Sequence, residues 1–211
     1  SINGYVIAYQ KIPPFIVTLA SMIYVQGIAL FVTGGYSIAI DTDHSLMALG
    51  RGDIWGVPIS ALVALVITVV GAIIFKQTKY GNYLTGIGAN EEAVRRSGIN
   101  VKRVKLVTYL LSGLLASLAG LIVALRLGSG SSNIGTAFEL DVIAAVILGG
   151  TSLFGGYGTM VGTLLGVTLI GIINNGLTLM HVSPFAIQIV EGVVLLIAVI
   201  LNIRFFGSSH K

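Results

Sequence analysis

GIGANEEAVRRSGINVKRVK, residues 86–105, is the long polar segment of an otherwise apolar chain, and its residue order predicts a helix, a turn and a second helix. Asn90 is a favourable N-cap, the two glutamates that follow it place negative charge in the first turn, and the two arginines place positive charge in the last. Gly98 is suited to end this helix. A second helix is expected to begin at Asn100 and to lead into the next apolar run.

The first of these two helices would have about seven residues. Isolated helices shorter than roughly 12 to 15 residues are marginal in water, so a helix of this length needs a surface to pack on. The alternative is an ordinary solvated loop between two membrane spans. Capping signals at both ends of the segment favour the docked helix.

The composition is that of an integral membrane protein. Of the 211 residues, 55% are hydrophobic and 9% are charged, whereas soluble domains carry about 25% charged residues. The net charge is +4, but residues 76–105 alone hold seven Lys and Arg against two Glu, a net of +5. The basic charge is therefore local, which is typical of a cytoplasmic loop and argues against nucleic-acid binding.

Cysteine and histidine usage gives no sign of a metal site. The chain has no cysteine and three scattered histidines, so neither a thiolate site nor a metal-binding cluster is expected. The sequence begins at Ser1 without a signal peptide, and residues 1–10 are like the inner end of a helix whose start is missing. We therefore expect an N-terminally truncated protein.

The apolar runs predict an all-α, polytopic helical membrane protein with about six membrane segments, one of them a broken helix. Full spans are expected at residues 14–32, 58–75, 106–125, 157–180 and 185–203. The ten residues 139–148 would reach about 15 Å, roughly half of a bilayer core. They precede the glycine-rich stretch 149–158, and residues 1–211 are expected to form a single transmembrane domain.

Charge also sets the orientation of the segments. Two lysines at the inner end of the second span place residues 76–105 on the cytoplasmic side by the positive-inside rule. The mildly acidic stretch 36–57 is then outside, and the basic tail 204–211 is inside. One glycine ridge in the fifth segment, at 158, 162 and 166, predicts close helix packing.

A short internal similarity predicts a possible inverted repeat. Asn-Gly at residues 3–4 is followed by Pro-Phe at 14–15 and an apolar span, and Asn-Gly at 175–176 is followed by Pro-Phe at 184–185 and another. The two copies would cross the membrane in opposite directions. Inverted repeats are common in transporters, where the transport pathway lies between the halves.

Catalytic motifs are missing from the sequence, so the chain is not expected to be an enzyme. The stretch nearest to a phosphate-binding loop, residues 150–155, is followed by Gly156 where such a loop requires lysine. Any ATP hydrolysis is therefore expected on another chain, and this chain is expected to bind no cofactor and no metal.

Polar groups inside the expected spans are the remaining functional candidates. Asn174 and Asn175 lie near the outer end of one span, and Glu191 lies at a matching depth in the next, about 10 Å below the outer turn. A hydrogen bond between Glu191 and one of the two asparagines is geometrically possible. Alternatively, the asparagines bond only to neighbouring backbone.

Five stretches closely resemble the permease subunit of bacterial ABC importers for simple sugars, of the ribose, xylose and arabinose type. They are IPPFIVTLASM (12–22), GANEEAVRRSGINVKRVK (88–105), SGLLASLAGLIVALRL (112–127), ELDVIAAVILGGTSLFGGYGTMVGTLLG (139–166) and INNGL (173–177). The resemblance implies a permease that dimerises around a central pathway in the bacterial inner membrane. It also implies that a complete family member has a longer N-terminal part than this sequence, in agreement with the missing start. It also implies a periplasmic sugar-binding protein and two cytoplasmic ATPase domains that hold ATP and Mg²⁺.

The resemblance also assigns roles to residues. Within the cytoplasmic loop 76–105, the family's coupling helix, which docks in a cleft of the ATPase, matches Gly88, Asn90, Glu91, Glu92, Ala93, Arg96, Ser97, Gly98 and Ile99. Candidates for the translocation pathway are Thr151, Ser152, Asn174, Asn175 and Glu191. Many relatives are expected to carry a basic residue at position 191, so the last span departs from the family pattern.

Three alternatives remain open at this stage. A branched-chain amino acid ABC permease would share the fold but carry a cargo with charged ends, whereas neutral groups such as Asn174 and Thr151 suit sugar hydroxyls. An ion-coupled secondary transporter would work without an ATPase. A truncated, non-functional remnant would lack part of the pathway.

Overall fold

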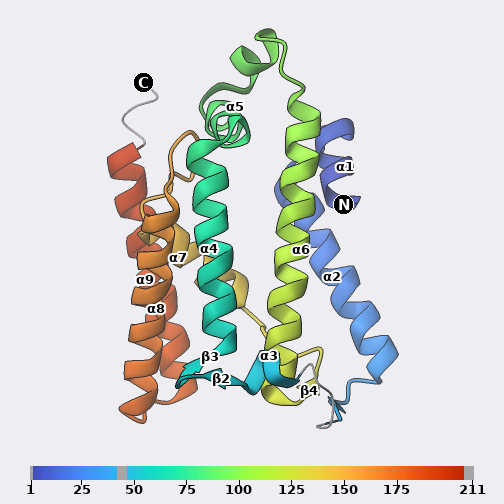
Figure 1. Cartoon of the computed structure of the whole chain (residues 1–211), viewed down its shortest axis with the longest axis vertical. Coiled ribbons are helices and arrows are strands. Elements are labelled where there is room, and N and C mark those ends of the chain that lie inside the picture. The colour runs from blue at the N-terminus through green and yellow to red at the C-terminus, as the bar shows by residue number, and fades with distance from the viewer. Residues whose placement is uncertain (1, 42–46, 207–211) are drawn as a thin grey trace. The chain divides into compact units, whose positions relative to one another are not determined.

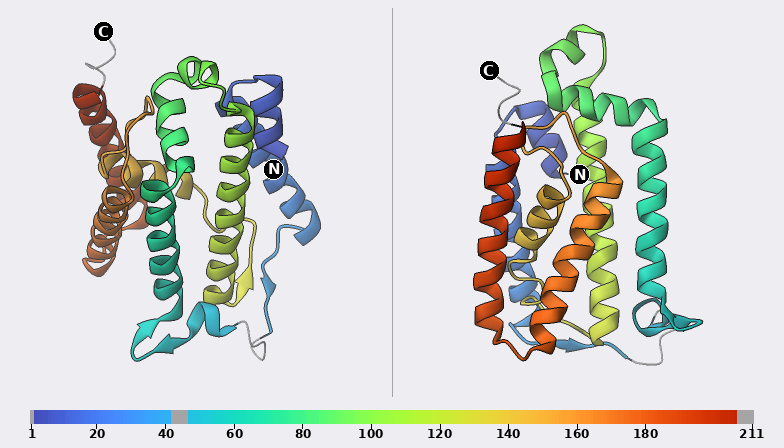
Figure 2. Two further views of the ribbon diagram at one scale, coloured as in Figure 1. Left: turned by 45° about the horizontal axis from the view of Figure 1, so that its top comes forward. Right: turned by 90° about the vertical axis from the view of Figure 1, so that its left-hand side faces the viewer.

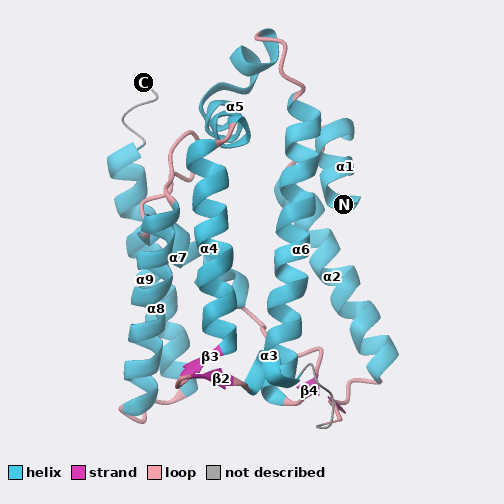
Figure 3. Ribbon diagram, in the orientation of Figure 1, coloured by secondary structure: helices cyan, strands magenta, loops and turns pink. Residues whose placement is uncertain are grey.

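The computed structural model describes residues 2–41 and 47–206, and it is almost entirely helical there (Figures 1 and 3). The elements in order are α1 (Ile2–Gln10), α2 (Pro14–Thr33), β1 (Ile38–Ala39), α3 (Met47–Arg51), β2 (Asp53–Ile54), β3 (Val57–Pro58), α4 (Ile59–Gln77), α5 (Lys79–Arg96), α6 (Val101–Leu127), β4 (Ser129–Gly130), α7 (Phe138–Leu148), α8 (Met160–Leu179) and α9 (Pro184–Phe206).

The membrane segments agree with the sequence prediction. Within the described residues, five helices are long and apolar enough to cross a membrane, namely α2, α4, α6, α8 and α9. The eleven-residue α7 is too short to span and corresponds to the predicted broken helix. The chain is therefore a multi-pass, all-α membrane protein, as predicted. Part of the predicted basic inner tail, residues 207–211, lies outside the described residues.

Helical structure on the polar side extends further than the sequence predicted. α5 begins at Lys79, so eleven residues of helix precede Asn90 where we expected only loop. The stretch contains three glycines, at 81, 86 and 88, and glycine is a poor helix former, so the sequence did not predict a helix there. The short α3 and the two-residue strands β1 to β4 were also missed.

The chain divides into two compact units, Ser1–Ile67 with Gly98–Ile134, and Thr68–Ser97 with Gly135–Lys211. Helix α4 begins in the first unit and ends in the second. A single domain over residues 1–211 stays a prediction.

In the first unit, α1 and α3 both pack on α6. A Cβ atom on Gly4 of α1 would lie 2.9 Å from Cβ of Tyr109, so only glycine permits this approach. Asn3 of α1 donates a hydrogen bond of 2.8 Å to Oγ of Ser21 in α2. Strand β1 pairs with β4 and β2 pairs with β3, both antiparallel.

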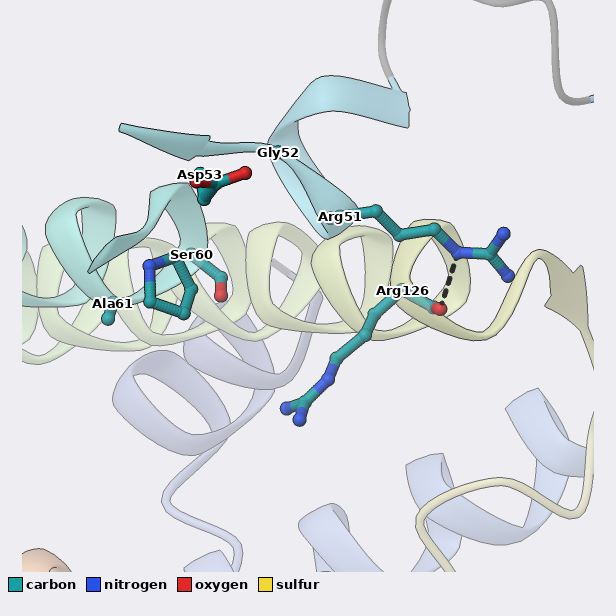
Figure 4. Close-up of a pocket in the computed structure, with 8 residues that line it drawn as sticks. Arg51, Gly52, Asp53, Ser60, Ala61 and Arg126 are labelled. Carbon is teal, nitrogen blue, oxygen red and sulfur yellow. Dashed lines mark hydrogen bonds between the residues drawn. The ribbon is translucent and has the colours of Figure 1, made fainter. Parts of the chain in front are cut away.

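At the far end of α6, Arg51 of α3 caps the helix (Figure 4). Its Nε atom donates a hydrogen bond of 2.9 Å to the carbonyl oxygen of Arg126, in the last turn of α6. A cation at this position satisfies a terminal carbonyl and complements the helix dipole. An open hollow of about 520 Å³ lies beside this contact, and it is lined by residues of α3, β2, β3, α4 and α6.

In the second unit, α7, α8 and α9 form a small helical cluster around Ala144, Ala145 and Ile170 (Figure 2). Two glycines of the predicted ridge allow the contact between α7 and α8. A Cβ atom on Gly166 would lie 2.0 Å from the carbonyl oxygen of Ala145, and one on Gly162 would lie 2.1 Å from that of Gly149. The backbones of α7 and α8 therefore touch directly, as small-residue packing in membranes requires.

Candidate coupling segment and membrane polar groups

The predicted cytoplasmic helix is present as the last segment of α5, residues 90–96. Asn90 has φ −158° and ψ 97°, so the helix is kinked there and a new segment starts. Its Oδ1 atom accepts a hydrogen bond of 3.0 Å from the backbone N–H of Ala93. This is N-cap geometry, and the prediction that Asn90 caps the helix is confirmed.

The other end of the segment also follows the prediction. The N–H of Ser97 donates to the carbonyl oxygen of Ala93, and its hydroxyl donates to the same oxygen at 3.0 Å. Gly98 has φ +83°, the left-handed conformation that glycine adopts without a steric cost. Helix α6 then starts with Asn100 as its N-cap, which accepts a bond of 3.2 Å from the N–H of Arg103. The helix, turn and helix pattern is confirmed.

Glu92 forms ion pairs with two arginines of the same segment. It contacts Arg95 three residues on and accepts a hydrogen bond of 3.2 Å from Nε of Arg96. The hydrogen bond from Arg95 to Glu92 raises the pKa of the Arg95 guanidinium above its ordinary value. These side chains are exposed, and exposed ion pairs contribute little stability.

One face of the segment is open. Ala93, Arg96 and Ser97 lie three and four residues apart, which places them on one face, and all three are exposed. Val94 is half-buried and points back to the first part of α5, where its Cγ2 atom lies 3.1 Å from the place of a Cβ on Gly86. The segment is therefore folded against its own helix on one side and presents small and basic groups on the other.

The remaining residues assigned to the coupling segment have different surroundings. Glu91 is exposed in the first turn, and Ile99 is half-buried in the turn before α6. Gly88, in contrast, faces the protein, because a Cβ atom there would lie 2.4 Å from the backbone nitrogen of Gly156. The sequence placed Gly88 in the segment but did not indicate this contact.

Among the membrane polar groups, Asn174 and Glu191 are paired. Nδ2 of Asn174 in α8 donates a hydrogen bond of 2.8 Å to Oε1 of Glu191 in α9. Oδ1 of Asn174 is buried and has no hydrogen-bond partner among the described residues. The predicted bond is confirmed and uses Asn174, while Asn175 is exposed and takes no part in it.

Thr151 and Ser152 lie elsewhere. They belong to the loop between α7 and α8, residues 149–159, which Asn202 of α9 holds by hydrogen bonds to Thr151 and Leu153. Asn202 lies eleven residues beyond Glu191, about 16 Å along the helix axis. The structure therefore divides the five pathway candidates into two groups, and Thr151 and Ser152 border a separate hollow of about 280 Å³ beside α7.

Asn202 is the residue that the sequence reasoning missed. It is 4% exposed and lies in the last apolar span. A lone amide in such a span requires hydrogen-bond partners, and this was the available signal. Among residues 2–41 and 47–206, no three acidic or histidine side chains gather closely enough to hold a metal ion.

The fold and these groups define a multi-pass helical membrane protein that carries paired polar side chains inside its spans. The family described as the permease component of the branched-chain amino acid transport system matches residues 1–199, and the chain belongs to that family.

Its relatives within curated proteins include sugar permeases. The ribose import permease protein RbsC of Bacillus subtilis (strain 168) is 46% identical over 201 residues, which are 95% of this chain and 62% of the relative. The L-arabinose transport system permease protein AraH of Escherichia coli (strain K12) is 38% identical over 95% of this chain and 61% of its own length. The probable ABC transporter permease protein YphD of the same strain is 42% identical over 95% of this chain and 60% of its own length.

The predicted resemblance to sugar ABC permeases is confirmed by these relatives. The chain spans about three fifths of the length of the relatives named here. No solved structure gives a significant match.

Proposed function

We propose that the chain acts as the transmembrane permease subunit of an ATP-binding-cassette importer for a monosaccharide, located in a bacterial inner membrane. The observation that carries the proposal is the capped segment 90–96, a helix of seven residues with an open face of small and basic groups. The segment packs on the first part of α5 through Val94 alone among the contacts described above, and a helix this short gains stability when a second surface covers its open face. The names of the ribose and arabinose relatives support a sugar as cargo.

In this proposal the chain itself is not catalytic. A separate ATPase chain binds ATP and Mg²⁺, and its closure moves the docked segment 90–96. A periplasmic binding protein delivers the sugar, and a second copy of the permease completes the pathway. The role of this chain is to change the packing of its membrane helices when the segment moves.

Uncharged hydrogen-bonding groups favour a sugar over a branched-chain amino acid. Asn174, Thr151 and Ser152 offer amide and hydroxyl groups, which match sugar hydroxyls, whereas an amino acid brings two formal charges that need opposite charges. Glu191 is already engaged by Asn174. The branched-chain amino acid permease is the second candidate, because the description of the family names that cargo, but the ribose and arabinose relatives give it less support than the sugar permease.

The test is reconstitution of the permease with its ATPase and binding protein in proteoliposomes. Each of a panel of monosaccharides, and each branched-chain amino acid, is added with the binding protein, and both ATP hydrolysis and uptake of the added compound are measured. Stimulation by one or more sugars supports the proposal. Stimulation by amino acids only would assign the rival cargo, and uptake driven by an ion gradient without ATP would assign a secondary transporter. A chain that gives no uptake under any condition would be a non-functional remnant.

A further inference from the structure

The loop between α7 and α8, residues 149–159, is attached to α9 by one buried side chain. Nδ2 of Asn202 donates a hydrogen bond of 2.8 Å to the carbonyl oxygen of Thr151, and its Oδ1 accepts one of 3.2 Å from the N–H of Leu153. A carboxamide carries a donor and an acceptor at one tip, so a single side chain holds two backbone groups. The start of the loop is therefore fixed to α9.

The loop is also closed on itself and fixed to α7. The N–H of Ser152 donates to the carbonyl oxygen of Tyr157 at 3.0 Å, and that of Thr151 donates to the carbonyl oxygen of Val146 at 3.2 Å. Ser152 is 8% exposed. These bonds restrict the motion of the loop backbone, so the loop is expected to be rigid and not flexible.

The other end of the loop lies directly against α5. A Cβ atom on Gly88 would lie 2.4 Å from the nitrogen of Gly156, and one on Gly155 would lie 2.8 Å from Cα of Gly88. Neither position has room for any side chain, so the two backbones are in van der Waals contact. Gly88 lies two residues before Asn90, where the segment 90–96 begins.

From these contacts we infer that the 149–159 loop transmits displacement of α5 to α7 and α9, and that Asn202 is the positioning residue that makes the loop rigid enough to do so. The inference rests on the proposed function, because it takes the segment 90–96 as the part that an ATPase moves. Packed backbones resist compression, so a shift of Gly88 must move Gly155 and Gly156 with it. Asn202 then carries the shift to α9.

A reversible crosslink tests whether α5 and the loop move together. The chain has no cysteine, and Cβ of Ala89 lies 3.1 Å from the place of a Cβ on Gly156, close to disulfide range. In the permease assembled with its ATPase and binding protein, Ala89→Cys with Gly156→Cys should form a disulfide on oxidation. Sugar-stimulated ATP hydrolysis should be the same in the oxidised and reduced forms. Failure to crosslink, or loss of stimulation only in the oxidised form, would overturn the inference.

Substitution of the positioning residue tests the link to α9. Asn202→Leu keeps the size of the side chain and removes both hydrogen bonds, so stimulation by the sugar-loaded binding protein should fall roughly two- to thirty-fold, the range over which single residues change coupling. Basal hydrolysis and retention of the ATPase should not change. Unchanged stimulation would contradict the inference.

Glycine substitutions give a matched pair that does not depend on the folding of the Asn202 variant. Gly88→Ala forces α5 away from the loop and should also lower stimulation. Gly171→Ala, in α8, adds the same methyl group where nothing described lies within 4 Å, and should leave stimulation unchanged. Equal behaviour of the two variants would count against the inference. The parent chain is measured first, and no stimulation there would reject the proposed function before any variant is compared.

Discussion

Asn174 and Glu191 join α8 to α9 through a hydrogen bond of 2.8 Å between Nδ2 and Oε1. The two residues stand on opposite sides of the short turn that connects the helices, ten residues before and seven residues after Pro184. A carboxylate in a membrane span is costly without such a partner. The bond therefore fixes how the last two helices pack at this depth.

Glu191→Gln should be nearly neutral, whereas Glu191→Leu should lower the stability of the protein by about 1 kcal/mol, the size of an intramembrane hydrogen bond. Glutamine keeps an oxygen that accepts from Asn174, and its amide can also serve the buried Oδ1 of Asn174. Leucine offers neither group. Thermal unfolding in detergent measures the difference, and equal midpoints for the two variants would exclude a stabilising bond.

A similar bond is present in the α1 and α2 hairpin, where Asn3 donates to Ser21 at 2.8 Å. Asn3 lies eleven residues before Pro14 and Ser21 lies seven after it. The short sequence repeat aligned Asn3 with Asn175, but the structure uses its neighbour Asn174. The duplication itself stays a prediction. In both hairpins, however, the residue seven positions after the proline accepts a hydrogen bond from an asparagine side chain.

Arg51→Ala should lower the free energy of unfolding by about 0.3 to 1 kcal/mol, the usual contribution of a cation at a helix C-terminus. The variant removes the bond of 2.9 Å from Nε to the carbonyl oxygen of Arg126, which Figure 4 shows. Arg51→Lys keeps the charge and should lose less. Denaturant unfolding in detergent compares the three proteins, and the effect of Arg51→Ala should shrink as salt is added.

Cysteines at Arg96 and Trp55 should be labelled from opposite sides of the membrane. Side chains at both positions are strongly exposed, 80% and 98%, and the chain has no other cysteine. The net +5 of residues 76–105 places position 96 in the cytoplasm and position 55 outside. An impermeant maleimide applied to intact cells should modify position 55 only. Labelling of position 96 in intact cells would show that the orientation is the opposite of the predicted one.

Local signals in the sequence were sufficient for the spans and for the caps. The N-caps at Asn90 and Asn100 and the left-handed Gly98 depend on a few neighbouring residues, and each was predicted. Even the Asn174 and Glu191 bond followed from counting residues on either side of a short turn. Contacts between distant segments were beyond such reasoning.

The contact of Gly88 with Gly156 and the two bonds of Asn202 join residues that are far apart in the sequence. Nothing local to Gly88 distinguishes a backbone contact from flexibility. Asn202 was passed over because a single polar residue scarcely alters the hydropathy of a span of 21 residues. The sequence therefore indicated the exposed segment 90–96 of α5, but it did not indicate that the 149–159 loop packs against Gly88 of the same helix.

Ala93→Arg should prevent the segment 90–96 from docking on the ATPase. Ala93 is exposed at the centre of the open face, and arginine there adds bulk and a positive charge where the docked helix carries a methyl group. Ala93→Ser is the matched control, since it stays small and should behave like the parent.

Gly98→Val should act similarly to Ala93→Arg, because a β-branched residue resists the φ of +83° that Gly98 adopts, and so misdirects the end of the helix. Neither change lies in a membrane-spanning helix, so both variants should insert normally, which membrane extraction and detergent chromatography verify. They should nevertheless lose the ATPase on co-purification and fail to support sugar uptake. If Ala93→Arg retained both the ATPase and full uptake, residues 86–105 would be an ordinary cytoplasmic loop and the docking hypothesis would be wrong.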